Sequence, residues 1–260
     1  MTVESSKVDR ITGVSSMAMR HVLAKLCDAY DQQSGQPVTI VSVGGVDAAR
    51  RVDAGEAFDF VVLAADVIEQ LAANGRVDPG SRTDLARSAV AVAVAAGATR
   101  PDVSTESALR DAVLCARSIG YSTGPSGAHL VRLFERWGIA NAVAPRIVQA
   151  SPGVPVATLL ARGDVELGFQ QLSEFMHLPG IDVIGLLPPE IQVATVFSAA
   201  VCTASKCSAA AKALLSFLAS PEADATKRCH GMEPARAGAA TAQLAREFGL
   251  ARDDYTHKLL

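Results

Sequence analysis

One stretch of small residues limits the fold more than any other part of the chain: Gly120-Tyr121-Ser122-Thr123-Gly124-Pro125-Ser126-Gly127. It follows the apolar run 113–119 and opens a helical pattern, because apolar residues recur at helical spacing from Leu130 to Trp137. A strand, a turn of small residues and a helix start can bind an anion, since free N–H groups converge there and the helix dipole favours negative charge. The alternative for one such turn is an ordinary N-capped connection.

The same strand–turn–helix arrangement is predicted at three other places. Ser15 and Ser16 follow a short strand at 10–14 and precede a helix, which either serine is expected to cap. Gly44 and Gly45 follow the strand 36–43 and precede a helix at 46–54, where glycine leaves room for close backbone approach. The fourth turn, Ser151 to Pro155, precedes a helix at 156–162. Four such turns in one chain favour a shared ligand site.

The rest of the chain alternates between expected strands and helices, which favours parallel βαβ units and an α/β fold. Strands are expected at 58–63, 88–96, 146–149, 165–169, 182–186 and 194–202, and helices at 66–73, 106–113, 209–218, 222–229 and from Ala239 onward. Extended apolar runs begin near Ala86 and Val193. We therefore expect two lobes, residues 1–86 with 194–260 and residues 87–193, with two turns from each facing one cleft.

The composition limits the class of partner. The chain has 260 residues and a net charge of −3, so it has no basic footprint for nucleic acid, and a small anion must be bound by local donors. Residues 1–10 lack a basic segment followed by an apolar one, which predicts a cytoplasmic protein unless a signal has been removed. The apolar run 89–96 is too short to span a membrane, so no membrane partner is expected.

The metal-binding and cofactor classes find little support in the sequence. The five histidines show no paired ligand spacing, and the five cysteines form no Cys-x-x-Cys pair, which predicts reduced, mostly buried thiols. Neither the dinucleotide fingerprint nor the phosphate loop is present. We therefore expect no metal and no cofactor.

Several local patterns together resemble a known family. They are Val14-Ser15-Ser16-Met17, Ala49 to Gly55 followed by Asp59-Phe60 and Ala65-Asp66, Gly124-Pro125-Ser126-Gly127, and Gly163-Asp164 followed by Leu167-Gly168. As a set they resemble the molybdate-binding component of bacterial ABC transporters, over nearly the whole chain. The resemblance implies the two-lobed type II solute-binding-protein fold, in which each lobe is a mixed, mostly parallel sheet flanked by helices and the ligand lies between the lobes.

That family holds its oxyanion at four helix starts and with one tyrosine. The resemblance assigns the first contact to Ser16, the third to Ser126 and the fourth to Gly153 or Val154. Two positions depart: Gly45-Val46 stands where the family has a serine, and Gln171, after Gln170, stands where it has the tyrosine. The loss of two hydroxyl donors counts against molybdate, because a buried oxyanion needs its oxygens satisfied.

A branch of the same fold that resembles the aconitate isomerases fits other stretches better. These are Gly168 to Glu174, Pro179 to Ile181, Leu187 to Glu190 and Thr195 to Ser198. The resemblance implies a cofactor-free isomerase of a small unsaturated polycarboxylate, with aconitate as first choice. The alternatives are a binding protein for molybdate, tungstate or another small oxyanion, and a ligand-sensing module.

Isomerisation by an allylic proton shift needs a base and donors for the charge that develops on a carboxylate. The candidate catalytic residues are His129, Glu174 and Ser16, each of which has the alternative of an ordinary surface or structural role. Gln171 has the alternative of bonding only within the protein, and Arg50 and Arg51 that of an exposed helix face. The candidate substrate-binding residues are Ser15, Ser16, Gly44, Gly45, Val46, Thr123, Ser126, Gly127, Gly153, Val154, Gln170 and Gln171.

Overall fold

The computed structural model describes residues 10–235, and these divide into two compact units. Unit 1 combines residues 10–86 with 196–230, and unit 2 combines residues 87–195 with 231–235. The chain passes between the units inside β4 (Thr83–Ala95), inside β9 (Ala194–Val201) and after His230. The helix expected from Ala239 onward lies outside the described residues.

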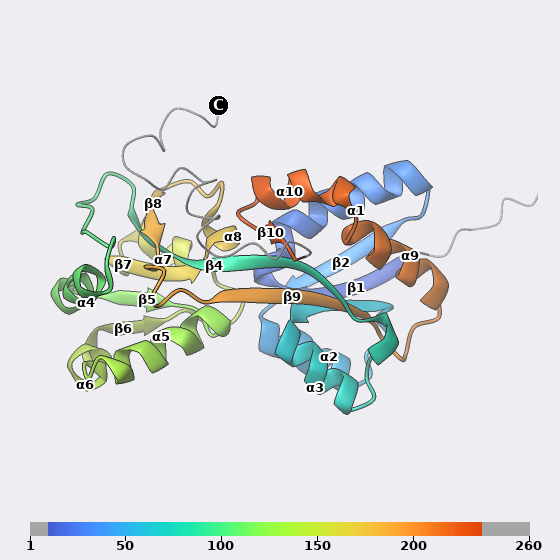
Figure 1. Cartoon of the computed structure of the whole chain (residues 1–260), viewed down its shortest axis with the longest axis horizontal. Helices are drawn as coiled ribbons and strands as arrows, with labels where there is room; N and C mark the ends of the chain where they lie inside the picture. The colour runs from blue at the N-terminus through green and yellow to red at the C-terminus, as the bar shows by residue number, and fades with distance from the viewer. Residues whose placement is uncertain (1–9, 236–260) are drawn as a thin grey trace, which may run out of the picture. The chain divides into compact units, whose positions relative to one another are not determined.

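Unit 1 is built on a sheet with the strand order β2-β1-β3-β9 (Figure 1). β1 pairs in parallel with β2 and β3, and β9 pairs antiparallel to β3. Helices α2 and α3 cover one face, and α1 and α9 lie on the other (Figure 1). The bounds are β1 Ile11–Ser16, η1 Met17–Met19, α1 Arg20–Ser34, β2 Val38–Val43, α2 Gly45–Asp53, β3 Phe60–Ala64, α3 Ala65–Ala73, η2 Pro79–Ser81, α9 Ser208–Leu218, η4 Pro221–Ala223 and α10 Asp224–Cys229.

Unit 2 is built on strands β4, β7, β5 and β6, in that order. β5 pairs in parallel with β6 and β7, β4 is antiparallel to β7, and β8 and β10 also pair with β4. The bounds are α4 Glu106–Cys115, β5 Ile119–Tyr121, α5 Pro125–Arg136, α6 Ala140–Val143, η3 Ala144–Arg146, β6 Ile147–Gln149, α7 Val156–Arg162, β7 Leu167–Gln171, α8 Leu172–Phe175, β8 Ile181–Leu186 and β10 Glu233–Pro234.

The alternation of side chains along β4 builds the two cores of unit 2. Val90, Val92 and Val94 pack in one cluster with the apolar face of α5. Ala91 and Ala93, which point the other way, pack in a second cluster with side chains of α7 and α8. Because both faces of the strand are covered, its sequence is almost continuously apolar.

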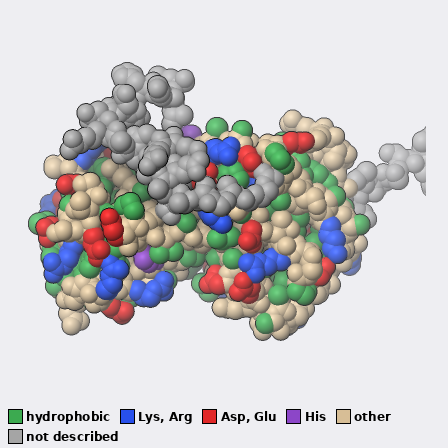
Figure 2. Space-filling view, in the orientation of Figure 1, with side chains coloured by type: hydrophobic (Ala, Val, Ile, Leu, Met, Phe, Trp, Pro, Cys, Tyr) green, Lys and Arg blue, Asp and Glu red, His purple; other side chains and the backbone are tan. Residues whose placement is uncertain are grey.

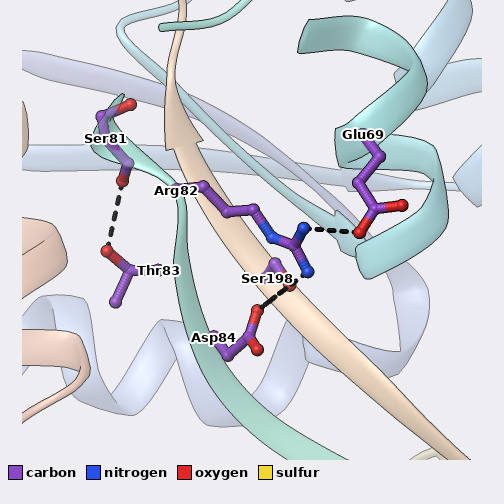
Figure 3. A network of polar contacts seen from close by, with 6 residues as sticks. All are labelled: Glu69, Ser81, Arg82, Thr83, Asp84 and Ser198. Atoms are coloured by element: carbon purple, nitrogen blue, oxygen red, sulfur yellow. Dashed lines mark hydrogen bonds and ion pairs between the residues drawn. The ribbon is translucent and has the colours of Figure 1, made fainter. Parts of the chain in front are cut away.

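The beginning of β4 is fixed to its neighbours in unit 1 by polar contacts (Figure 3). Arg82 forms ion pairs with Glu69 of α3 and with Asp84, and the Ser198 hydroxyl of β9 donates to the Asp84 carboxylate at 2.5 Å. The buried Ser81 hydroxyl accepts from the Val201 N–H at 2.9 Å. These contacts account for a strand that begins at Thr83, five residues earlier than the apolar run alone predicted.

The structure corrects two other expectations about the elements. The run 113–119 is the end of α4, an extended connection and only then the strand β5. Val113 is buried on the helix, four residues after Leu109, so its apolar character belongs to the helical pattern. Neither Ser15 nor Ser16 caps α1 with its side chain, because the 3-10 turn η1 separates the strand from the helix.

The boundary between the units also differs from the expected lobes at the C-terminal end. Residues 231–235 belong to unit 2, whereas the expected first lobe combines residues 1–86 with 194–260. Two contacts explain the difference. β10 pairs with β4, and the backbone of Gly231 lies so close to Leu172 and Met176 that an added Cβ would meet both at 2.9 Å.

Candidate anion-binding site

Two of the predicted turns come together in unit 1. The last residue of β1, Ser16, pairs in parallel with Val43, the last residue of β2. The carboxyl ends of these strands therefore lie at one edge, where parallel sheets bind ligands. Gly44 is the N-cap of α2, and a Cβ added to Gly45 would lie 3.8 Å from the Ser16 Cβ. The Ser16 side chain therefore lies beside the N-terminus of a helix, where a negative charge is favoured.

The two serines of this turn have different surroundings. The Ser15 hydroxyl is fully buried and lies 2.9 Å from the Ser42 hydroxyl and 3.2 Å from the Ser16 carbonyl oxygen. The Ser16 side chain is 8% exposed, and its oxygen has no hydrogen-bond partner among the described residues. A buried hydroxyl without a partner is costly, so Ser16 is the better candidate for contact with a ligand. Val46, by contrast, is 70% exposed.

The other two turns lie at one edge of the sheet in unit 2. Tyr121 at the end of β5 pairs with Gln149 of β6 and with Phe169 of β7, and all three strands are parallel. Their carboxyl ends therefore bring together the turn before α5, the turn before α7 and the glutamine pair that ends β7. Gly153 has a φ of +79°, which glycine adopts without strain, and Val154 is exposed.

Packing and hydrogen bonds fix the turn before α5. The Ser126 side chain is buried, and its hydroxyl lies 3.2 Å from the Ser122 hydroxyl, whereas Thr123 is exposed. Gly127 lies directly against the backbone, because an added Cβ would be 1.8 Å from the Ser122 carbonyl oxygen. Gly124 is the N-cap of α5 and Pro125 is its first residue, an arrangement that leaves the first N–H groups without side-chain caps.

Gln170 connects the start of α7 to a carboxyl group. Its side-chain oxygen accepts from the Val156 N–H at 2.9 Å, and its side-chain nitrogen donates to Glu174 at 2.7 Å. The other carboxyl oxygen of Glu174 makes no hydrogen bond to a described residue. Burial raises the pKa of Glu174 to about 8, and the hydrogen bond from Gln170 opposes part of that rise. Glu174 is therefore mostly protonated at neutral pH.

Gln171 is also bonded within unit 2. In the orientation that satisfies both ends of its carboxamide, the oxygen accepts from the Thr195 hydroxyl at 2.7 Å and the nitrogen donates to the Ser88 carbonyl at 3.0 Å. Because side chains alternate along a strand, one glutamine of the pair is expected to point to the ligand and the other inward. Both are 1% exposed, so a ligand that reaches either side chain has to replace an existing hydrogen bond.

His129 lies in the second turn of α5 and is partly buried. Its Nε2 is 2.8 Å from the carbonyl oxygen of Ile191. A carbonyl only accepts hydrogen bonds, so Nε2 carries the proton in this contact and Nδ1 is the basic nitrogen of the neutral ring. Burial is the main cause that lowers the pKa of His129, and the positive charges of Arg132 and Arg136 lower it further.

The two arginines near Gly45 have acidic partners of their own. Arg50 pairs with Asp47 at 3.0 Å, and Arg51 pairs with Glu56 and lies over the Phe58 ring. On the face drawn in Figure 2, basic and acidic side chains are interspersed. An anion in either unit is therefore attracted by local donors at the helix starts.

The other sequence expectations concern metals, membranes and thiols. Among residues 10–235 there is no group of three or more His, Cys, Asp or Glu that could hold a metal ion, and none of the helices described there is long and apolar enough to cross a membrane. The expectation of mostly buried thiols is wrong. Cys27 and Cys202 are buried, but Cys115 and Cys229, at helix ends, are exposed.

The contacts from Gln170 to Glu174 and to Val156 could not be read from the sequence. The residues Gln170 and Glu174 are four apart, which is one helical turn, but Gln170 ends a strand and only Glu174 lies on α8. A glutamine that caps a helix fourteen residues earlier leaves no local pattern, because the contact depends on how β7 packs against α7.

Comparison with solved structures relates the fold to binding proteins for small anions. The periplasmic molybdate-binding protein of Azotobacter vinelandii is 21% identical, with a TM-score of 0.71, over 85% of this chain and 98% of that one. The sulfate-binding protein SubI of Mycobacterium tuberculosis H37Rv is 19% identical, with a TM-score of 0.71, over 92% and 91%. At these identities the likeness establishes the fold alone, and the expected periplasmic-binding-protein fold is confirmed.

A curated relative matches more strongly in sequence. An aconitate isomerase from a Pseudomonas species is 35% identical over 233 residues, which are 87% of this chain and 88% of that protein. The model of the family described as "Bacterial extracellular solute-binding protein" matches residues 11–233. The chain therefore belongs to the bacterial extracellular solute-binding protein family.

Proposed function

We propose that this protein is an isomerase of a small unsaturated polycarboxylate, and that its substrates are cis- and trans-aconitate. Each unit by itself offers helix-start donors that can bind a carboxylate: the Ser16 hydroxyl and the amides at Gly45 in unit 1, and the turns at Ser126 and Gly153 in unit 2. These groups stabilise the negative charge that develops when a proton is removed next to a carboxylate. His129 and Glu174 are the candidate proton-transfer groups.

One observation carries the proposal further than sequence identity does. Beside the donors of unit 2 stands a carboxyl group, Glu174, whose pKa is raised to about 8. A receptor for an oxyanion gains nothing from a titratable carboxyl group beside its donors, since that group repels the ligand whenever it is ionised. An enzyme that moves a proton near neutral pH does need such a group.

Proton NMR in deuterium oxide tests the function directly. The purified protein is incubated with cis-aconitate, and we expect trans-aconitate to form with deuterium at the carbon that receives the proton. Conversion at the rate of a protein-free control would refute the isomerase. Conversion without deuterium would leave an isomerase but would argue against exchange of the moving proton with solvent.

A second function, a binding protein for molybdate or another tetrahedral oxyanion, is supported by the Ser16 hydroxyl beside the start of α2. Gly45 distinguishes the two functions. A side chain at this position would have only the Ser16 Cβ, at 3.8 Å, as a near neighbour, so Gly45→Ser fits without strain. It supplies the hydroxyl that the molybdate receptors have and this chain lacks.

We expect Gly45→Ser to increase the affinity for molybdate by about tenfold, the effect of about 1.4 kcal/mol from one added hydrogen bond to an anion. Aconitate conversion falls in the same variant because the added side chain occupies space. Gly45→Ala is the matched control, with the bulk but not the hydroxyl. Tight molybdate binding by the unaltered protein, with no conversion of aconitate, would favour the binding protein.

A further inference from the structure

The contact between Gln170 and Glu174 is the part of the site that the sequence does not reveal. Glu174 lies on α8, three residues after β7 ends, at the same strand edge as the turns that precede α5 and α7. One carboxyl oxygen is bound to Gln170, and the other makes no hydrogen bond to a described residue. The side chain is partly buried and has no ion-pair partner among the residues described. The carboxyl group is therefore oriented by the hydrogen bond from Gln170, without an ion pair to a cation among the described residues.

We propose that Glu174 is the residue that removes and returns the proton, and that Gln170 is a positioning residue that fixes the carboxyl group relative to the start of α7. This inference rests on the proposed isomerase function. Gln170 is itself fixed, because its oxygen accepts from the Val156 N–H at 2.9 Å while its nitrogen donates to Glu174 at 2.7 Å. Because Val156, Gln170 and Glu174 all belong to unit 2, these two hydrogen bonds hold the carboxyl group in one orientation.

The reaction balances with a single proton. The ionised carboxylate of Glu174 takes a proton from the CH2 carbon of aconitate. The C–H electron pair is then delocalised over this carbon, the two carbons of the double bond and an adjacent carboxylate. The proton returns from Glu174 to the far carbon of the original double bond, where a C–H bond forms, and the double bond moves to the former CH2 carbon. Since the carbon skeleton of aconitate has the same carboxyl groups at both ends, the new double bond can have the other geometry. No oxidant, reductant or co-reactant is needed.

His129 is the competing base, and the structure gives reasons to prefer Glu174. The imidazole connects α5 to the segment before β9 through its bond to the Ile191 carbonyl. This hydrogen bond holds the imidazole ring in place and gives His129 a structural role. The Glu174 carboxyl group, in contrast, is bound only by the side-chain nitrogen of Gln170, and its second oxygen makes no hydrogen bond to a described residue.

The pH profile of kcat/KM distinguishes the two bases. A base must be deprotonated to act, so the activity rises as the pH passes its pKa. If Glu174 is the base, the activity rises near pH 8, where burial places the pKa of its carboxyl group. If His129 is the base, it rises below pH 6.5, because burial lowers the pKa of that imidazole. The strands that pack most closely against α8 are β7, which carries no titratable side chain, and β8, which carries Asp182. Asp182 is not among the causes of the pKa shift at Glu174.

Glu174→Gln removes the base and keeps the shape of the side chain. We expect kcat to fall by about 10²–10⁴-fold, the usual contribution of a general base. Binding of tricarballylate, the saturated analogue of aconitate, should change by less than threefold in a thermal-shift titration. Glu135→Gln, an exposed glutamate on α5, is the matched control and should keep the original kcat.

Gln170→Leu tests the positioning role. Loss of its hydrogen bond removes a group that favours the ionised form of Glu174, so the rise of activity moves to higher pH. A purely structural Gln170 would lower the melting temperature and leave the pH profile in place, and that result would overturn its positioning role.

The outcomes separate the inference from the function it rests on. If the unaltered protein converts aconitate and Glu174→Gln converts it equally well, Glu174 is not the base and the isomerase stands. If His129→Gln loses the activity while Glu174→Gln keeps it, the base is His129. If the unaltered protein does not convert aconitate, both the function and the role of Glu174 are refuted.

Discussion

At the scale of single residues, the hydroxyls of Ser15 and Ser16 differ: the first is structural and the second is a candidate for ligand binding. Ser15 is bonded to Ser42, whereas the buried Ser16 oxygen has no partner among the described residues. A buried hydroxyl without a partner destabilises the folded state, because it loses its hydrogen bonds to water and gains none in return. A bound carboxylate would supply the missing acceptor, and Ser16 is therefore expected to matter for binding and not for stability.

We expect Ser16→Ala to melt at the same temperature as the unaltered protein or above it, and to bind trans-aconitate about 10–100-fold more weakly. The loss corresponds to about 1.5–3 kcal/mol for a hydrogen bond to a charged group. Ser15→Ala is the control and should lower the melting temperature of the free protein. Thermal unfolding with and without ligand measures both effects. A destabilised Ser16→Ala with unchanged affinity would make Ser16 a structural residue.

At the scale of elements, the start of α5 depends on the absence of one side chain. The Ser122 carbonyl oxygen lies where a Cβ of residue 127 would be, at 1.8 Å. The helix and the turn before it can therefore approach each other only if position 127 is glycine. The close approach of Gly127 to the Ser122 carbonyl therefore sets the conformation of the turn in which Ser126 lies.

Gly127→Ala should consequently lower the free energy of unfolding by about 3 kcal/mol, the upper end of the usual cost of overpacking, because backbone atoms have to move. Gly124→Ala is the matched control in the same turn, since its Cβ would meet only the Ser122 hydroxyl, at 3.6 Å. Urea denaturation measures both variants. Equal urea midpoints for Gly127→Ala and Gly124→Ala would show that the backbone of the turn accommodates the added methyl group at little cost.

At the scale of the whole molecule, each unit is assembled from segments far apart in the chain. Asp59 joins the two segments of unit 1. It is 7% exposed and accepts hydrogen bonds from the Thr12 N–H at 2.8 Å, the Ser205 hydroxyl at 2.8 Å and the Cys207 N–H at 3.3 Å. Burial raises its pKa, but these hydrogen bonds outweigh burial and leave the pKa below its usual range. The ionised carboxylate therefore stabilises the folded chain.

We expect Asp59→Asn to lower the free energy of unfolding at pH 7 by about 1–3 kcal/mol, because an amide cannot accept all of these bonds. A carboxyl group whose pKa is lowered by folding stabilises above its unfolded pKa of about 3.9, and the effect is lost as the pH falls through the folded value. The difference between the variant and the unaltered protein should thus shrink below about pH 4. Urea unfolding from pH 7 to pH 3 tests this, with the exposed Asp31→Asn as control. A difference that stays constant with pH would rule out the ionised carboxylate as its source.

Much of the local structure followed from the sequence alone. The spacing of apolar residues predicted α5, and the proline at the end of the preceding turn predicted the start of α7. Small residues predicted both turns, because spacing and steric freedom are properties of neighbouring residues. The chemical types of the candidate site, hydroxyls and amides at helix starts, could be recognised for the same reason. The strand β5 was missed in part, since a short apolar run is compatible with a helix end.

Tertiary structure decided which of the candidate residues have a partner. The unpartnered oxygen of Ser16, the bond from Gln170 to the start of α7 and the raised pKa of Glu174 all depend on residues that are distant in sequence. Desolvation and hydrogen bonding are set by how elements pack, and a linear pattern does not record packing. The sequence by itself determined most of the elements, the positions of the four turns and the resemblance to solute-binding proteins. Only the folded chain distinguished a serine that holds the structure from one that is free to bind, and a surface glutamate from a candidate base.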